Sequence, residues 1–140
     1  MAVSIIKATH EHDVSILILD HEQNYWVLTA HSVSEFSFTQ LYLSNIIYEI
    51  CLLNENNTNL EELRNTLFFL LGGHEYADEH KQFLWKPVER VLQEIKNAER
   101  VLLEIEPVAG AHILLLAKAI SLEHKGKQTL TLPHAGMWQI

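Results

Sequence analysis

The segment NLEELRNTLFFLLGG, residues 59–73, predicts the clearest element of the chain. Its apolar residues recur at the spacing of one helical face, and they are Leu60, Leu63, Leu67, Leu70 and Leu71. Asn59 stands where a helix N-cap belongs, and Glu62 follows three residues later, as in a capping box. Gly72 and Gly73 come after the last leucine, where a helix is easily ended. We therefore expect a helix here, with the other segments packed around it.

The segment before this helix also has helical spacing. Its periodic apolar residues are Leu43, Ile46, Ile47, Ile50 and Leu53, and Ser32 or Ser34 could cap such a helix. The segment fits a strand as well, so the start of this helix stays open, and the residues that would alternate are Phe36, Phe38, Leu41 and Leu43. Residues 54–59 are rich in Asn, Glu and Thr and read as a turn. Together the two helices are predicted to form an αα-hairpin.

The N-terminal part predicts strands over Ala2–Ala8, Val14–Leu19 and Tyr25–Ala30. Their short connections favour an antiparallel meander. Downstream, Pro87 can begin a helix that ends near Asn97, and residues 101–106 alternate as a strand.

The run Gly110–Leu122 is apolar nearly all round and predicts a buried helix, followed by a strand over 128–132. The order strand, helix, strand suggests a parallel crossover. The expected fold class is α+β, with a mixed, mostly antiparallel sheet of about four to five strands. The αα-hairpin is central, and further helices pack mainly on one face. Residues 1–140 are expected to form a single globular domain.

Composition limits the function. The chain has 140 residues and a net charge of −8, with 10 basic against 18 acidic residues. This argues against nucleic acid and anionic membranes as partners and allows a basic protein partner. The single cysteine, Cys51, cannot form an internal disulfide and lies in an apolar run, so we interpret it as a core thiol of a cytoplasmic protein. The start shows no signal peptide, and no apolar run is long enough for a bilayer.

Three segments carry side chains that could support chemistry. Two histidines and two acids in His10–Asp13 could hold a metal, although a solvated turn explains them as well. Residues His74–His80 form a second polar cluster without the zinc-protease spacing. The turn Pro107–Ala111 could hold an anion if a helix begins there. Trp26 and Trp85 are expected to pack in or near the core, whereas Trp138 is left open.

No motif marks a known family, so function is argued by class. We expect a non-catalytic acidic binding protein, of the kind that acts as an immunity or inhibitor protein and neutralises a basic toxin domain. The alternative is a small metal-dependent hydrolase that uses the His and acid clusters, and a homodimer is possible. Neither a cofactor nor a metal nor a catalytic residue is assigned. The acids expected to contact the partner are Glu55, Glu61, Glu62, Glu75, Asp78 and Glu79.

Overall fold

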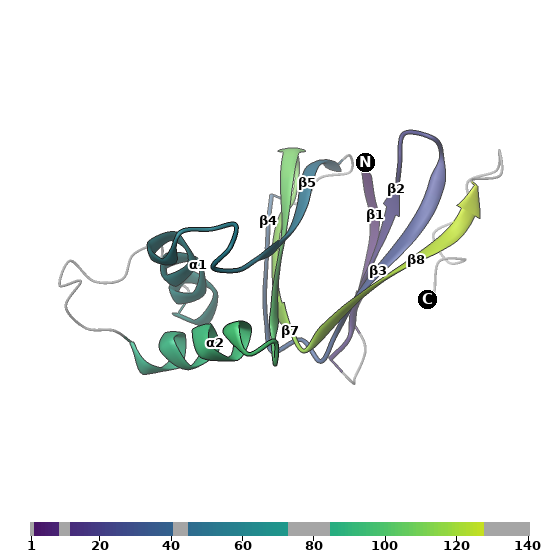
Figure 1. The fold of residues 1–140 in the computed structure, drawn as a ribbon. Coiled ribbons are helices and arrows are strands. Elements are labelled where there is room, and N and C mark those ends of the chain that lie inside the picture. The colour runs from purple at the N-terminus through teal and green to yellow at the C-terminus, as the bar shows by residue number, and fades with distance from the viewer. Residues whose placement is uncertain (1, 9–11, 41–44, 73–84, 128–140) are drawn as a thin grey trace.

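The computed structural model describes residues 2–8, 12–40, 45–72 and 85–127, and strands dominate it. In chain order the strands are β1 (Ala2–Ala8), β2 (Val14–Leu19), β3 (Asn24–His31), β4 (Glu35–Thr39), β5 (Asn45–Leu53), β6 (Val101–Ala109), β7 (His112–Ala117) and β8 (Ala119–Lys127). The helices α1 (Leu60–Gly72) and α2 (Lys86–Lys96) lie together on one side of the strands (Figure 1). Neither of these two helices is long and apolar enough to cross a membrane.

The strand pairs of the described residues are all antiparallel. They form one ladder in the order β4-β7-β6-β5-β1-β2-β3-β8. The ladder folds into two layers, β4-β7-β6-β5 and β1-β2-β3-β8, which face each other (Figure 1). Among the described residues, two pairs join β1 to β5 where the layers meet, and they are Ala2 with Ile46 and Val3 with Asn45.

A second junction lies where β3 leads into β4 and β7 leads into β8. Ser34 donates its backbone N–H to the carbonyl of Leu116, and Lys118 donates to the carbonyl of His31, each at 2.9 Å. Ser32, between β3 and β4, has a φ of 52°, in the left-handed region. These bonds tie the two crossing stretches to each other as they pass between the layers.

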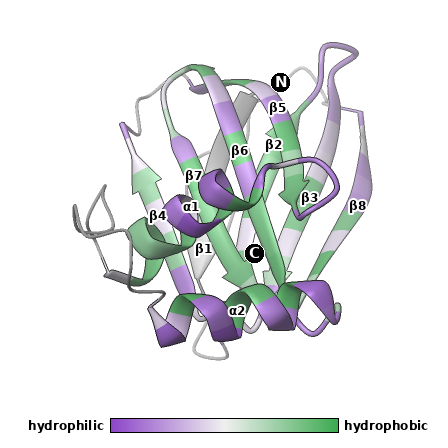
Figure 2. Cartoon of the chain, turned by 60° about the vertical axis from the view of Figure 1, so that its left-hand side comes forward, coloured by the Kyte–Doolittle hydropathy of each residue, from purple (hydrophilic) through white to green (hydrophobic). Residues whose placement is uncertain are grey.

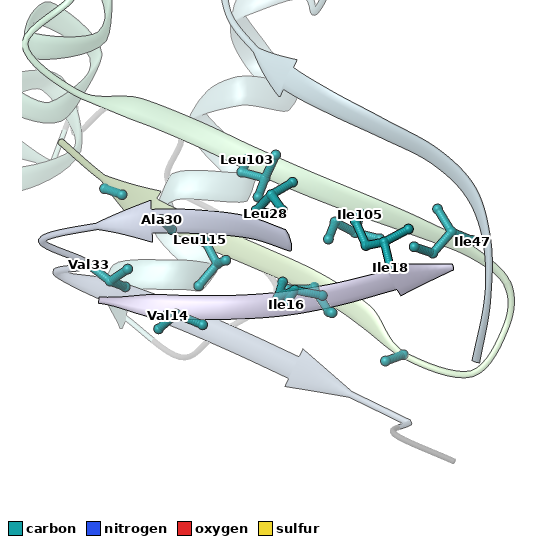
Figure 3. Close-up of a cluster of buried hydrophobic side chains, with 13 residues drawn as sticks. Val14, Ile16, Ile18, Leu28, Ala30, Val33, Ile47, Leu103, Ile105 and Leu115 are labelled. Carbon is teal, nitrogen blue, oxygen red and sulfur yellow. The ribbon is translucent and has the colours of Figure 1, made fainter. Parts of the chain in front are cut away.

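The larger apolar core lies between the two layers (Figure 3). Alternate residues of β2, which are Val14, Ile16 and Ile18, point into it and are buried. From the opposite layer, Ile105 of β6 and Leu115 of β7 are fully buried in the same cluster. Full burial of one such side chain contributes roughly 1.5–3 kcal/mol, so this core holds the layers face to face.

A second apolar core lies between the helices and the outer face of β5-β6-β7. The helices contribute Leu63, Leu67, Leu70, Val88, Val91, Leu92 and Ile95, and the strands contribute Leu53, Leu102, Leu114 and Leu116. Strand β7 is buried on both faces, because Ile113 and Leu115 point into the first core while Leu114 and Leu116 point into the second.

The predicted αα-hairpin is wrong, because residues 45–53 form strand β5. The spacing of Ile47 and Ile50 resembles that of a helix for a local reason. The register of β5 against β6 shifts between Ile46 and Ile47 and again between Ile47 and Glu49. Such irregularities break the alternation of a strand. As a result, Ile47 and Ile50 contact the same core although they are three residues apart.

The predicted helix over Gly110–Leu122 is also wrong, since this segment forms β7 and the start of β8. An apolar run without alternation fits a strand buried on both faces as well as it fits a buried helix. The predicted parallel crossover fails with it, because β6 and β7 pair antiparallel through a tight turn at Gly110, whose φ is 95°. The strand predicted over 128–132 lies outside the described residues.

The fold class is corrected accordingly. The sequence predicts an α+β fold with a mixed sheet of about four to five strands and a central αα-hairpin. The structure is mostly β, with eight antiparallel strands and two helices in its described part. The open alternative for Phe36 and Phe38 is settled in favour of a strand, β4.

Two of the three helices predicted after residue 58 are confirmed, as α1 and α2. The Asn59 side chain accepts the backbone N–H of Glu62 at 2.8 Å, as an N-cap does. Helix α2 begins one residue before Pro87. Leu67 is fully buried under α1, whereas Leu60 is 42% exposed and lies off the buried face. The three N-terminal strands form the expected antiparallel meander.

Candidate functional site

A polar groove runs between helix α1 and the outer faces of β5 and β6. Polar side chains dominate its first cavity of about 530 Å³, which is lined by Glu49, Cys51, Leu53, Asn57, Thr58, Glu62, Asn65, Thr66 and Glu104. A second cavity of about 370 Å³ is lined by Thr39, Asn65, Thr66, Phe69, Glu104, His112 and Leu114. Three residues belong to both, so we treat the cavities as one site, the acidic groove. Its size is typical of ligand sites.

Strands β5 and β6 form the first wall of the acidic groove. Alternation along β5 places Glu49, Cys51 and Leu53 on the side that faces α1. Glu104 of β6 lies directly opposite Cys51 in the ladder. Leu53 belongs to the core under the helices, so this wall changes from apolar to acidic along β5.

Helix α1 forms the second wall, because only one side of it is seated on the sheet. Leu63 and Leu67 are fully buried beneath it. Glu62 and Thr66, each one residue earlier, lie on the neighbouring side and line the groove. Figure 2 shows the hydrophilic start of α1 and the turn before it beside the sheet. The helical period therefore determines both which side of α1 packs on the sheet and which side lines the groove.

The charge of the acidic groove is negative. Glu49, Glu62 and Glu104 line it, and none of its lining residues is a lysine or an arginine. Glu104 has a histidine partner, since its Oε1 lies 2.8 Å from Nε2 of His112. Within the part of the chain that the structure describes, Glu49 and Glu62 have no ion-pair partner. The groove therefore presents carboxylate charge that a cationic ligand could neutralise.

Cys51 responds to this charge. Its pKa is raised, first by burial and then by the negative charges of Glu49 and Glu104. A nucleophilic cysteine needs the opposite setting, in which a nearby cation stabilises the thiolate. The sulfur instead accepts a weak contact from Nδ2 of Asn57 at 3.6 Å. The interpretation of Cys51 as a core residue in an apolar helical run is corrected, because it lies half-buried on β5 and lines the groove.

The six acids predicted to contact a partner divide between two regions. Glu62 lines the acidic groove. Glu55, in the turn before α1, and Glu61, in its first turn, are exposed. The other three, which are Glu75, Asp78 and Glu79, lie outside the described residues.

Sequence reasoning missed Glu49, Glu104 and His112. Their signal is the alternation of polar with apolar residues along β5 and β6, which a helical reading of residues 43–53 hides. Even with the strands correctly assigned, the pairing of Cys51 with Glu104 joins residues far apart in the chain. The groove could not be assembled without that pairing.

The predicted metal clusters lie largely outside the described residues, which omit positions 10, 11 and 74–80. Asp13 is described, and it accepts the backbone N–H of Ser32 at 2.9 Å. Its second oxygen lies 3.4 Å from Nδ1 of His31. Among the residues with assigned positions, no group of three or more His, Cys, Asp or Glu is arranged to hold a metal ion.

The turn after β6 is not the anion site that the sequence suggested. No helix begins there, and Ala111 donates its N–H to Oδ1 of the buried Asn45 at 3.0 Å. A Cβ on Gly110 would clash with Asn45, so the glycine is required both for its positive φ and for this close approach. The amide that could have met an anion already has a partner.

The tryptophans have structural contacts. Trp26 is half-buried against the first core, and its Nε1–H donates to Oδ2 of Asp20 at 3.0 Å. Trp85 is 40% exposed and packs on Phe68 of α1, with ring centroids 5.3 Å apart. Trp138 lies outside the described residues.

The function has to be inferred from the geometry of the acidic groove, because comparison with known proteins gives no relative. The acidic groove offers three carboxylates, five side chains bearing amides or hydroxyls, one imidazole, and a thiol that its setting keeps protonated. Searches against family models, curated proteins and solved structures found no match to the chain.

Proposed function

We propose that the chain is a binding protein whose acidic groove holds a basic segment of a partner protein. The observation that supports this most is the gathering of Glu49, Glu62 and Glu104 in one groove whose lining contains no lysine or arginine. The net charge of −8 has the same sign. A negative surface of this kind speeds the approach of a basic partner and disfavours acidic ones.

The chemistry of the lining favours arginine or lysine side chains as the ligand. The amide oxygens of Asn57 and Asn65 and the hydroxyls of Thr58 and Thr66 can accept hydrogen bonds from a guanidinium or ammonium group. All three carboxylates line the first cavity, but among the described residues no three His, Cys, Asp or Glu side chains are arranged to hold a metal ion. An extended segment with several positive charges suits this distribution better than a single metal ion does.

Such a protein would act as an immunity or inhibitor protein that blocks a basic effector domain in the cytoplasm. The exposed Glu55 and Glu61 stand at the start of α1 and would extend the contact beyond the groove. The alternative, a metal-dependent hydrolase, is favoured by no observation on the described residues, so we do not propose it.

The experiment measures the affinity of a fluorescent peptide of alternating lysine and glycine by anisotropy. The test variant replaces Glu49, Glu62 and Glu104 with Gln. The matched control replaces Glu22, Glu99 and Glu123, which are exposed. Both variants carry the same net charge, −8 + 3 = −5.

We expect the groove variant to weaken binding by about tenfold or more, which corresponds to about 1.4 kcal/mol. The control should change affinity by no more than about threefold, because its charges lie outside the groove. Binding by the unmodified protein should weaken as salt is added, since salt screens exposed charges beyond about 8 Å at physiological ionic strength. Equal losses in the two variants would show that the peptide senses only total charge, and would overturn the proposal.

A further inference from the structure

Three side chains from distant parts of the sequence meet on the outer face of the β1-β2-β3-β8 layer. Asp13 precedes β2, His31 ends β3 and Ser121 lies on β8. His31 Nδ1 is 3.4 Å from Oδ2 of Asp13, and its Nε2 is 3.0 Å from Oγ of Ser121. The neighbouring Ala30 is buried in the core, so alternation turns His31 outward.

The hydrogen-bond pattern determines which ring nitrogen of His31 carries the proton. Asp13 Oδ1 accepts the backbone N–H of Ser32 at 2.9 Å, which is the main cause that lowers the pKa of this carboxyl. An ionised carboxylate can only accept, so Nδ1 must be the donor. The neutral ring then has its lone pair on Nε2, where it can accept the hydroxyl proton of Ser121. Each of the three groups therefore has the role that a general-base serine site requires.

A residue with a hydroxyl group stands beside the serine on the neighbouring strand. Thr29 is directly opposite Ser121 in the ladder, and the Cβ atoms of such pairs are about 4.5–5.5 Å apart. The Oγ1 of Thr29 lies 3.2 Å from Oγ of Ser15, and either can donate. When Ser15 donates, the proton of Thr29 is available to an oxyanion next to Ser121.

We propose that Asp13, His31 and Ser121 form a serine acyl-transfer site that hydrolyses short carboxylic esters. The site is open, since Ser121 is exposed and the His31 side chain is 43% exposed. A small ester can therefore reach the serine. This activity goes beyond the proposed function and does not depend on it, because the acidic groove lies on the other layer.

The reaction has two balanced steps. Ser121 Oγ attacks the ester carbonyl carbon while Nε2 of His31 takes the hydroxyl proton, and the ester C–O bond then breaks as His31 returns that proton to the leaving alcohol. Water next attacks the acyl-serine, again losing a proton to Nε2, and the proton passes to Oγ as the carboxylic acid leaves. Asp13 holds the ring and stabilises the imidazolium in both steps. The Nδ1 to Asp13 distance is at the long end for a hydrogen bond, as is common before substrate binds.

The test combines covalent labelling with ester hydrolysis on the full chain. A fluorophosphonate transfers its phosphonyl group to an activated serine and releases fluoride, and peptide mass spectrometry locates the label. We expect about one label per chain on Ser121. Hydrolysis of p-nitrophenyl acetate should fall about 100-fold or more in Ser121→Ala and His31→Gln, the scale of general-base catalysis. Ser37→Ala, a serine of β4 outside the site, should behave as the unmodified protein does.

Asp13→Asn separates a catalytic role from a structural one. An Asn can still accept the Ser32 N–H, but its amide would donate to Nδ1 and move the ring proton to Nε2, which then cannot accept from Ser121. Labelling and hydrolysis should both fall while the melting temperature changes little. Absence of label on Ser121 in the unmodified protein, or an unmodified rate of hydrolysis in Ser121→Ala, would overturn the proposal whatever the variants' stability. An unmodified rate in Asp13→Asn would overturn the role of Asp13.

Discussion

The acids around helix α2 and the acids of the groove differ in their partners. Glu89 Oε1 lies 2.7 Å from Nε of Arg64, and Glu94 Oε2 lies 2.9 Å from Nε of Arg100. All three arginines of the chain, with Arg90 as the third, contact one of these two glutamates. Among the described residues, the three carboxylates of the acidic groove have a single ion-pair partner, His112.

Burial divides these acids in the same way, because Glu49 and Glu62 are exposed. The side chains of Glu89 and Glu94 are 32% and 23% exposed, and that of Glu104 is 26% exposed. The partly buried acids of both regions thus have a partner, which is arginine for Glu89 and Glu94 and His112 for Glu104. The exposed Glu49 and Glu62 have no ion-pair partner among the described residues. Carboxylates that repel each other contribute nothing to folding, and the exposed ones remain available to the positive ligand that we propose.

The largest expected effect is a loss of folding stability when the packing of α1, the element that both regions share, is disrupted. Helix α1 carries Arg64 and also forms a wall of the groove, and Leu67 beneath it is fully buried. Leu67→Ala should destabilise the fold by about 2–5 kcal/mol in denaturant unfolding, because it empties a packed site. Leu60→Ala is the matched control, since Leu60 is 42% exposed and should cost less than about 1 kcal/mol. Equal losses would mean that α1 is not seated as described.

The next effect concerns the start of α1, which positions Glu62 at the groove. Asn59→Ala removes the side-chain cap on the N–H of Glu62 and should cost about 0.5–2 kcal/mol. Asn56→Ala, in the preceding turn, should cost less than about 0.5 kcal/mol, because its exposed side chain makes no described cap. Thermal unfolding of both variants distinguishes them, and a silent Asn59→Ala would contradict the capped start.

A smaller effect contrasts the two acidic regions directly. Arg64→Gln breaks a pair with Glu89 that is about one-third exposed, so it should cost about 0.5–1 kcal/mol. Glu62→Gln removes a groove carboxylate with no described counter-ion, so stability should change by less than about 0.5 kcal/mol in either direction. Urea unfolding at low salt measures both. A larger loss for Glu62→Gln would show that the groove carboxylates support the fold after all.

The smallest effect is a change in the pKa of the Cys51 thiol. Negative charge on Glu49 and Glu104 helps to raise this pKa, so replacing both with Gln should lower it. The rate of alkylation by iodoacetamide against pH reports the thiolate fraction, and its midpoint should move to lower pH. Replacing Glu22 and Glu123 should leave the midpoint in place. An unmoved midpoint in the groove variant would mean that its carboxylates do not act on Cys51.

The sequence predicts helix α1 well because several local signals agree. The cap at Asn59 and the buried Leu63 and Leu67 are all written within one segment, and each is found in the structure. Strands β5 and β7 are mispredicted because non-local packing decides them. The shifted register of β5 imitates helical spacing, and burial of β7 on both faces removes its alternation.

The sites depend on the same non-local pairing. Glu62 could be found as an acid on a predictable helix, but Glu104 enters the groove only through its pairing with β5. Ser121 meets His31 because β8 pairs with β3, and a helical reading of residues 110–122 conceals this. Sequence patterns predict which face of a single helix or strand is apolar or polar. Both sites, however, are formed by residues of different helices and strands that only the folded chain brings together.

The most direct test of the acidic groove uses Cys51, the single cysteine of the chain, as a reporter inside it. A lysine-rich peptide that carries an activated disulfide should form a mixed disulfide with Cys51 about tenfold or more faster than a glutamine-rich peptide of equal length. High salt, or Gln at Glu49, Glu62 and Glu104, should remove the difference. Equal rates for the two peptides with the unmodified protein at low salt would contradict the claim that the groove recognises a basic segment.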